Sequence, residues 1–555
     1  MSSKNEPLAN VDAAWLSMDD PTNLMMITGV MTFKNLLNMD HLMAIINHRW
    51  LKFERFKQRV SHPRLPGGTP YWEVDPNFDL RAHIRRVALP EPGDQNALQE
   101  LVSDLMSTPL DPSKPLWQMH IVENFEGGSA IINRIHHCIA DGMALMYVLF
   151  SLTDMTPDAP WPEEATTVIK KQKRESSNAG GGPIGSLFKQ GVSIARTTRS
   201  VTGKLVQESW TTVNHPSRAT GFAQTGAEYS KAAARLALYS VDPATPFKGK
   251  LGVSKKGAWS RPLPLKDVKR IKAATSTTVN DVLVAAMSGA VRRYMLEKGV
   301  DPVDFRAVIP VNMRKPEEME QMGNKFGLVF LSLPISFADP IERLAEVNKR
   351  MTALKNSAEA GVALGILNAM GLSPGEIQSI ILKTFAMKAT TVLTNVPGPP
   401  VPLFLAGSEI EDIMFWVPQS GRLGMGISIF SYAGKVYMGV ATDNGLVSDP
   451  DRIVDHFYTE FDLLLIRLNL REPATTKTDR VVNKSTQVDD LTVINGIGPK
   501  VADILYKEGI TNYDQLAEFE VTALEALLAT AGDQYQRMDA TSWPVQARYL
   551  ASIRN

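Results

Sequence analysis

Residues 115–142 have the sequence PLWQMHIVENFEGGSAIINRIHHCIADG, and the secondary structure of the first part of the chain can be predicted from this stretch. Two mostly apolar runs are separated by Glu126 and two glycines, a pattern typical of two β-strands joined by a tight turn. Apolar residues then recur at helical spacing from Met143 to Phe150. The two histidines and the aspartate at the end of the quoted stretch therefore lie where a strand gives way to a helix.

The remaining sequence continues this mixture of strands and helices. A helix with one apolar face is predicted after Thr278 and Asp281, which resemble a capping box, and strand-like runs follow it. A chain of 555 residues is too long for one hydrophobic core. We therefore predict an α/β protein with two halves and a small all-α module at the C-terminal end. The expected boundaries are 1–161 for the first half, 162–236 for a crossover or linker with a basic helix, 237–471 for the second half, 472–488 for a linker and 489–555 for the module.

The composition excludes several classes of protein. Hydrophobic residues make up 44% of the chain, as in a globular protein, and 59 basic residues balance 59 acidic ones. No overall field therefore attracts nucleic acid or an anionic membrane. The single cysteine excludes an intrachain disulfide framework and is typical of a reducing compartment. The N-terminal residues lack the pattern of a signal peptide, and no apolar stretch is long enough to span a bilayer, so we expect a cytoplasmic protein.

The pair His136 and His137 has several interpretations. A metal site is disfavoured because adjacent side chains on an extended segment point to opposite sides. A nucleophilic Cys138 would need a base aimed at it, and adjacent side chains seldom converge in that way. A nucleophilic serine would need a G-x-S-x-G turn, which the sequence lacks. Two hydrogen-bonded core histidines, or one histidine acting as a general base, remain open.

The neighbours of the histidines favour the general base. Asp141 is a charged residue among apolar ones, and a buried carboxylate needs a partner. We expect Asp141 to fix the loop through an arginine elsewhere in the chain, and Gly142 to let a substrate or backbone come close. The residues alone thus indicate a histidine base without a covalent intermediate, and they do not name the substrate.

The string His136-His137-Cys138-Ile139-Ala140-Asp141-Gly142 matches HHxxxDG, the motif of the CoA-dependent acyltransferase superfamily. Over residues 8–470 the chain resembles more specifically the bacterial wax ester synthase/diacylglycerol acyltransferase family. Three further segments carry the resemblance, in the expected order: Pro115-Leu116-Trp117, Asn280-Asp281, and TNVPGPP at residues 394–400.

The resemblance implies two chloramphenicol-acetyltransferase-like halves, each a mixed sheet flanked by helices, with a tunnel between them. Acyl-CoA is then a substrate, a fatty alcohol or diacylglycerol is the acceptor, and no cofactor or metal is required. His137 is implied to be the proton acceptor, while His136 and Asp141 support the loop.

The resemblance also implies contacts with substrate for Trp117, Asn280, Asn395 and Gly398. For Asn280 the alternative is capping of the helix that follows, a role that asparagine performs well. For residues 395–398 the alternative is a simple proline-rich turn.

Two other functions remain as alternatives to this O-acyltransferase. One is transfer of an acyl or peptidyl group from a carrier-protein thioester to an amine. The other is a non-catalytic protein that binds lipid or coats droplets. Residues 186–210 carry Lys189, Arg196, Arg199 and Lys204 without an acid before Glu208, which indicates a solvated helix face or peripheral contact with a membrane or lipid-droplet surface. The sequence sets no oligomeric state.

The C-terminal segment 491–517 departs from the usual pattern of that family and is similar to a helix-hairpin-helix module. Gly496 and Gly498 are expected to make the hairpin, and Pro499 suits a first helical turn. From residue 489 onward ten acidic residues face five basic ones, a net charge of about −5. Because nucleic-acid binding requires a basic surface, we expect a contact with protein instead.

Overall fold

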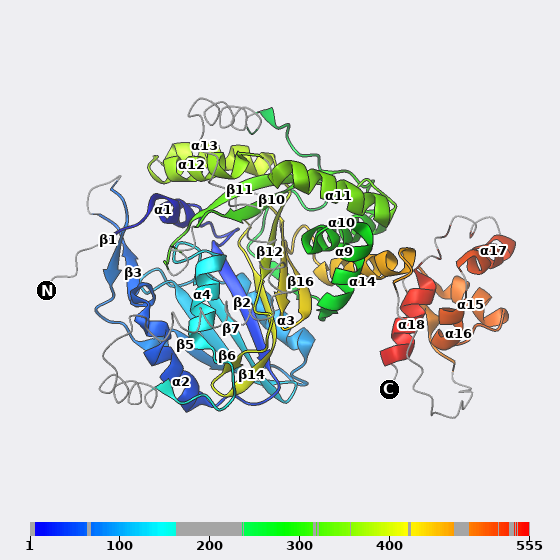
Figure 1. The fold of residues 1–555 in the computed structure, drawn as a ribbon, viewed down its shortest axis with the longest axis horizontal. Coiled ribbons are helices and arrows are strands. Elements are labelled where there is room, and N and C mark those ends of the chain that lie inside the picture. Colours follow the sequence, from blue (N-terminus) through cyan, green and yellow to red (C-terminus); the bar gives the residue numbers. More distant parts are fainter. Residues whose placement is uncertain are drawn as a thin grey trace. The chain divides into compact units, whose positions relative to one another are not determined.

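The computed structural model describes residues 6–63, 68–162, 236–470 and 488–553, with short gaps at 237, 315–317, 319–320, 356, 374, 420–422, 495, 520, 532–534, 536–537, 539 and 541. Contacts divide the chain into two compact units, residues 1–454 and 455–555, and each is described by itself (Figure 1). The predicted crossover with its basic helix and the predicted linker 472–488 lie outside the described residues, save for their end positions.

The first unit contains a six-stranded sheet built around the quoted stretch. In sheet order its strands are β13 (Phe404–Leu405), β14 (Ser408–Trp416), β2 (Met26–Phe33), β7 (Gly128–His136), β6 (Trp117–Phe125) and β5 (Ile84–Val87). Neighbours are antiparallel except β5 and β6, which run parallel. A separate three-stranded sheet contains β1 (Glu6–Pro7), β4 (Tyr71–Val74) and β3 (Gln58–Ser61).

A second, seven-stranded sheet belongs to the later half of the same unit. Its order is β11 (Phe326–Leu333), β10 (Phe305–Asn312), β12 (Thr391–Pro397), β15 (Met425–Tyr432), β16 (Lys435–Asp443) and β8 (Lys255–Trp259), with β9 (Leu263–Pro264) also paired to β16. The strand β12 is parallel to both of its neighbours, so this sheet is mixed as well. The predicted α/β class with two mixed sheets is confirmed.

The two halves interlock because β14, from the later half of the sequence, pairs with β2 of the first. The antiparallel ladder joins Ile410–Trp416 to Thr28–Phe33 across one β-bulge or irregularity. One continuous hydrophobic core contains residues from both halves, among them Ile131 and Phe430. The predicted boundaries by residue number therefore do not separate the sheets, since residues after 400 complete the first one.

Both predicted hairpins are present, and local residue preferences explain them. Glu126 and Gly127 join β6 to β7 with φ of +48° and +81°, and Ala433 and Gly434 join β15 to β16 with φ of +46° and +78°. Paired positive φ angles match the right-handed twist of hairpin strands, and glycine adopts them without steric cost.

Helices cover the sheets of the first unit (Figure 1). They are α1 (Asn10–Ser17), α2 (Met39–His48), α3 (Gln95–Met106), α4 (Gly142–Leu152), α9 (Leu265–Thr275), α10 (Val279–Glu297), α11 (Pro340–Lys355), α12 (Glu359–Gly371) and α13 (Gly375–Met387), while α14 (Pro450–Arg467) crosses the division between the units. Side-chain caps begin several of them: Asp141 caps α4, and Thr278 with Asp281 forms the predicted capping box of α10. No described helix is both apolar enough and long enough to cross a membrane.

In the second unit, the predicted module has a core of its own. Its helices are α15 (Pro499–Lys507), α16 (Tyr513–Glu518), α17 (Val521–Ala531) and α18 (Trp543–Ile553). Gly498 is the residue before α15, and Pro499 opens the helix, as the sequence predicts for that proline. Gly496 has φ of +92° and its backbone packs against the indole of Trp543, where a Cβ would crowd the indole nitrogen. The small all-α module is confirmed.

Gly398 follows the end of β12 and packs tightly against β15. A Cβ at this position would overlap the carbonyl oxygen of Ser431 and the ring of Phe430. We expect Gly398→Ala to lower the free energy of unfolding by about 1–3 kcal/mol, because an added methyl forces neighbours apart. The measurement is the midpoint of thermal unfolding.

Gly365, an exposed position in α12, gives the matched control because a Cβ there meets nothing within 4 Å. Gly365→Ala should be neutral or stabilising, since alanine favours a helix over glycine. Equal midpoints for the two variants would contradict the packing account.

Candidate active site

His137 begins the loop between β7 and α4 and is held in an aromatic stack. Its ring lies parallel to Trp15 of α1, with ring centroids 4.2 Å apart, and tilted to Phe326 of β11 at 5.7 Å. Its backbone N–H donates to the carbonyl of Met25 at 2.7 Å. The side chain is buried, and its Nδ1 has no hydrogen-bond partner among the described residues. Packing thus fixes the position of the ring, and a neutral imidazole can accept a proton from a substrate.

His136 plays a different part from its neighbour. It is the last residue of β7, and its Nδ1 accepts the backbone N–H of Cys138 at 3.1 Å. The opposite ring nitrogen, Nε2, lies 3.7 Å from a carboxylate oxygen of Asp19. These contacts tie His136 to the backbone of the loop and bring it near Asp19, and the supporting role that the resemblance implies for it stays a prediction.

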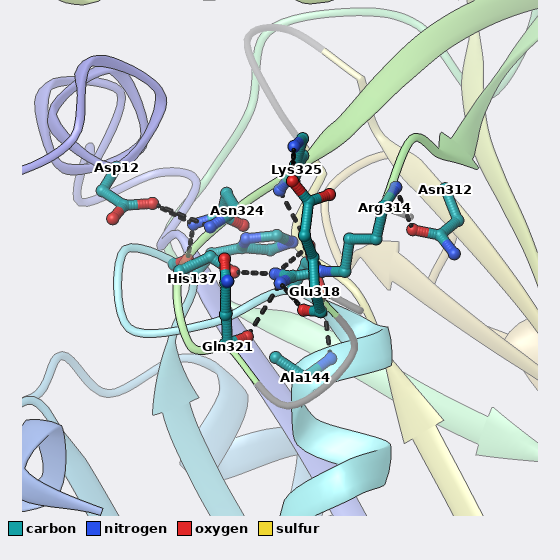
Figure 2. Close-up of polar contacts among 11 residues, drawn as sticks. Asp12, His137, Ala144, Asn312, Arg314, Glu318, Gln321, Asn324 and Lys325 are labelled. Carbon is teal, nitrogen blue, oxygen red and sulfur yellow. Dashed lines mark hydrogen bonds and ion pairs between the residues drawn. The ribbon is translucent and has the colours of Figure 1, made fainter. Parts of the chain in front are cut away.

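Asp141 joins the loop to the later half of the sequence through Arg314 and Lys325, both labelled in Figure 2. One carboxylate oxygen accepts the N–H of Ala144 at 3.0 Å and so caps α4. The other accepts from Arg314 Nη2 at 2.8 Å and from the backbone N–H of Lys325 at 2.9 Å. The side chains of Asp141 and Arg314 are only 6% and 2% exposed. Arg314 is thus the arginine partner that the lone carboxylate implied.

Asn324 and Gly323 add further hydrogen bonds to the loop, and we call them, together with Asp141 and Arg314, the clasp. Asn324 donates its side-chain N–H to the carbonyl of His137 at 2.7 Å and to Asp12 of α1 at 2.8 Å (Figure 2). Gly323, at φ of +91°, donates its N–H to the carbonyl of Ile139 and accepts one from Asp141. The loop is therefore fixed on both sides by backbone and side-chain bonds.

Burial shifts the pKa values of His137 and Asp12 in this site. Loss of solvent lowers the pKa of His137 to about 4, and the charge of Asp141 offsets only part of that effect. The ring is consequently neutral at physiological pH, the form that can accept a proton. Burial likewise raises the pKa of Asp12 to about 6, although bonds from Asn324 oppose it.

The same geometry bears on two other interpretations of this loop, a nucleophilic Cys138 and a metal site. Cys138 is fully buried, and burial raises its thiol pKa well above the ordinary value, so the reactive thiolate is disfavoured. No cluster of three or more potential ligand residues suits a metal ion within the described ranges.

An apolar cavity lies beside the loop, between β2, β7 and β14 of the first sheet, α4, and β12 and β15 of the second. Its empty volume is about 770 Å³, a figure that includes open solvent. Its lining includes Ile27, Gly29, Val30, Met31, Trp50, Asn133, Ile135, Gly142, Leu145, Met146, Val148, Leu149, Leu152, Val396, Ile413, Met414, Phe415 and Phe430. A Cβ on Gly142 would meet nothing within 4 Å, so this glycine faces open space.

Trp117 is a core residue, and the structure replaces its expected substrate contact with a packing role. Its side chain is 1% exposed, and its indole N–H donates to the carbonyl of Phe56 at 2.9 Å. It stacks on His83 and contacts Trp50, which lines the cavity. Trp117 therefore supports the cavity wall from behind.

Asn280 and Asn395 come together, since Asn395 Nδ2 donates to Asn280 Oδ1 at 2.6 Å. The capping alternative for Asn280 is wrong because Thr278 caps α10. Asn395 is a strand residue of β12 whose neighbour Val396 lines the cavity, so strand alternation turns Asn395 away from it. The pair ties α10 to β12, and its contact with substrate stays a prediction.

Gly398 packs against the ring of Phe430, which lines the cavity. A Cβ on Gly398 would displace that ring, so this glycine affects the cavity only through Phe430. The simple-turn alternative for residues 395–398 is wrong at its start, since β12 continues to Pro397.

Sequence reasoning missed Arg314, Asn324, Asp12 and Trp15. Arg314 and Asn324 lie more than 170 positions beyond the loop that they hold. The available signals were the need of Asp141 for a cation and the two adjacent basic residues, 314 and 315, that follow a strand-like run. Neither signal says which arginine closes the pair.

The fold and this loop define an acyltransferase, and three family models match the chain. The wax ester synthase/diacylglycerol acyltransferase catalytic domain matches residues 8–283, and the corresponding C-terminal domain matches 322–465. The chain belongs to this family. A third model, the RS2/RL21/YNQ2 HHH domain, matches residues 491–551.

One curated protein is similar in sequence, and two solved structures share the fold. A probable diacylglycerol O-acyltransferase of Mycobacterium tuberculosis is 27% identical over 408 residues, which cover 72% of this chain and 82% of that protein. The wax ester synthase/diacylglycerol acyltransferase of Marinobacter aquaeolei has a similar fold, with a TM-score of 0.58 at 21% identity over 84% of this chain and all of that one. The first condensation domain of the calcium-dependent antibiotic synthetase gives 0.52 at 13% identity over 84% of this chain and 96% of that one.

Loss of the Arg314 side chain should destabilise the catalytic unit. Arg314→Gln leaves Asp141 charged and buried without its cation, which costs about 3–5 kcal/mol for such pairs. The measurement is denaturant unfolding, followed by a probe in the first unit.

The double variant Asp141→Asn with Arg314→Gln should recover part of the loss, since asparagine still caps α4 and needs no cation. The single variants Asp141→Asn and Arg314→Gln are measured as well. If the double variant loses as much free energy of unfolding as the two single variants together, the ion pair is not the source of the effect.

Proposed function

We propose that this acyltransferase moves a fatty acyl group from acyl-CoA to the hydroxyl group of a long-chain alcohol or a diacylglycerol. The products are a wax ester or a triacylglycerol, together with free coenzyme A. The observation that carries the proposal is the buried imidazole of His137, held by stacking in the loop whose Gly142 lines the apolar cavity. The names of the matched family and of the mycobacterial relatives support the choice of substrates.

The reaction needs one base and no bond to the enzyme. His137 accepts the proton of the acceptor hydroxyl while its oxygen attacks the thioester carbonyl carbon. The carbon–sulfur bond then breaks, and the thiolate of coenzyme A takes the proton back from the imidazolium. The clasp of Asp141, Arg314 and Asn324 keeps the ring in place during these steps.

Stacking on Trp15 and Phe326 supports this role because it holds the ring in a dry environment. Water is kept from competing with the acceptor alcohol for the thioester in such a site. Acceptors of this kind partition into lipid, so we also propose that the enzyme works in peripheral contact with a membrane or lipid-droplet surface.

The first test is substitution of the base. His137→Ala should lower the rate of coenzyme A release by about 10²–10⁴-fold with acyl-CoA and a long-chain alcohol, because the hydroxyl loses its proton acceptor. Thiol release and product analysis, with alcohol and with diacylglycerol, measure it.

Cys138→Ala is the matched neighbour and should keep near-normal turnover, since the thiol is buried and inert. Turnover that survives in His137→Ala and is lost in Cys138→Ala would replace the base mechanism with a thiol mechanism. Wild-type protein without coenzyme A release would remove the proposed function altogether.

The second test is the pH dependence of kcat/KM. The neutral ring is the active form, so activity should be lost only as the pH falls through the lowered pKa of His137, about 4. Asp12 has a pKa of about 6, so it takes up its proton at a higher pH than His137 does. The variant Asp12→Asn cannot take up this proton and still offers an acceptor oxygen to Asn324, so it isolates the titration of His137.

In Asp12→Asn we therefore expect a level profile from about pH 8 to about pH 5. A midpoint near the ordinary histidine value of about 6.5 would mean that the ring is solvated during catalysis.

A further inference from the structure

The side chain of Asn324 joins His137 to the helix beside it. Its Nδ2 carries two protons, and the structure uses both. One goes to the backbone carbonyl of His137 at 2.7 Å, and the other goes to a carboxylate oxygen of Asp12 at 2.8 Å. The backbone N–H of Asn324 donates to the same oxygen of Asp12 at 3.0 Å. Asp12 is buried, so this contact is shielded from water.

These two acceptors decide which way the amide of Asn324 faces. A carbonyl oxygen and an ionised carboxylate only accept hydrogen bonds, so both require the NH₂ end of the amide. Asp12, with a pKa of about 6, is mostly ionised at neutral pH. The oxygen end of the amide therefore faces a third direction, and there Oδ1 is buried without a regular hydrogen bond to the described residues. Buried acceptors are nearly always paired, so we expect a donor close by.

The imidazole of His137 offers that donor. Its Nδ1 is likewise buried without a regular hydrogen bond, and Figure 2 shows the side chain of Asn324 beside the ring. Burial is the largest influence on the pKa of His137 and lowers it, and a hydrogen bond with the Asn324 side chain is among the smaller effects that raise it. Both protons of the amide are already donated, so only Oδ1 can accept this bond. Hydrogen bonds of catalytic groups are often poorly aligned before substrate binds and tighten in the transition state.

The bond between Asp12 and Asn324 also joins the two elements whose aromatic rings hold the imidazole. On α1, Trp15 follows Asp12 by three residues. Phe326, the first residue of β11, follows Asn324 by two. The rings of Trp15 and Phe326 have centroids 5.9 Å apart, and both contact the ring of His137. Without this bond the two aromatic rings could shift relative to each other, and the imidazole would shift with them.

We propose that Asn324 and Asp12 are positioning residues for the base: Asp12 orients the amide of Asn324, and the amide oxygen accepts the Nδ1 proton of His137. Such a bond sets which nitrogen of an imidazole carries the proton. Nε2 is then the nitrogen whose lone pair takes the proton of the substrate hydroxyl. The proposal rests on the proposed function, because it says how the same histidine is prepared for that reaction.

The experiment separates positioning from packing by removing one partner and then both. Asn324→Leu keeps the branched shape but leaves the carboxylate of Asp12 buried without its donors, so thermal unfolding should show a loss of stability. The double variant Asp12→Leu with Asn324→Leu removes both partners and should recover most of that loss. Ser17→Ala is the control on α1, because the exposed Ser17 donates its hydroxyl to the carbonyl of Ala14, away from the base.

Turnover should not follow stability in these variants. With acyl-CoA and a long-chain alcohol, kcat should fall about 10–100-fold in both Asn324→Leu and the double variant, because the base is no longer held in line. KM should change little, since neither residue is among those that line the apolar cavity. Asp12→Asn still offers an oxygen to Asn324 and should retain most of the wild-type kcat, and Ser17→Ala should match wild type. A kcat that recovers together with stability in the double variant would show a packing role alone and overturn the proposal.

The position of the ring proton can be measured without turnover. Nitrogen NMR of protein with isotope-labelled histidine, with the His137 signals assigned by comparison with His137→Ala, shows which ring nitrogen is protonated. Wild type at neutral pH should show a protonated Nδ1 and an unprotonated Nε2, and Asn324→Leu should show a mixture of the two forms.

An Nδ1 that stays fully protonated in Asn324→Leu would overturn the proposal, because the backbone carbonyl of His137 would then be the acceptor. If wild type shows the expected pattern but releases no coenzyme A, that result counts against the proposed function and not against this inference.

Discussion

The ion pair between Asp141 and Arg314 is the contact on which the rest of the active site depends. One carboxylate caps α4, neutralises a buried guanidinium and accepts a backbone N–H of Lys325. Two charges taken out of water are stable only when every lone pair and N–H is used, and this arrangement is close to that limit. The reactive loop thus has one conformation, fixed by residues far away in sequence.

Burial has opposite effects on the chemistry of His137. The stack with Trp15 and Phe326 excludes water and keeps the imidazole neutral, so the lone pair is available at any ordinary pH. The same burial weakens the base, because the charged imidazolium is poorly solvated. Asp141 lies near enough for its charge to favour the imidazolium, which moderates that penalty as the proton is transferred.

Local sequence signals predicted local structure well. The β6–β7 hairpin, the β15–β16 hairpin, the capping box of α10 and the hairpin glycines of the C-terminal module follow from turn and cap preferences over a few residues. The partner of Asp141, the insertion of β14 into the first sheet and the burial of Trp117 depend on contacts between distant segments. A single sequence holds no periodicity that reports such contacts, so they required the structure.

The shared sheet limits how the enzyme can move. Because β14 is hydrogen-bonded to β2, a clamshell opening of the two halves would have to break a backbone ladder that joins residues 28–33 to residues 410–416. Unpaired strand edges are costly to expose, so the halves cannot swing apart as rigid lobes between turnovers. Long apolar substrates and products must instead enter and leave the interior past side chains that change rotamer. We therefore expect product release to be a slow step of the catalytic cycle.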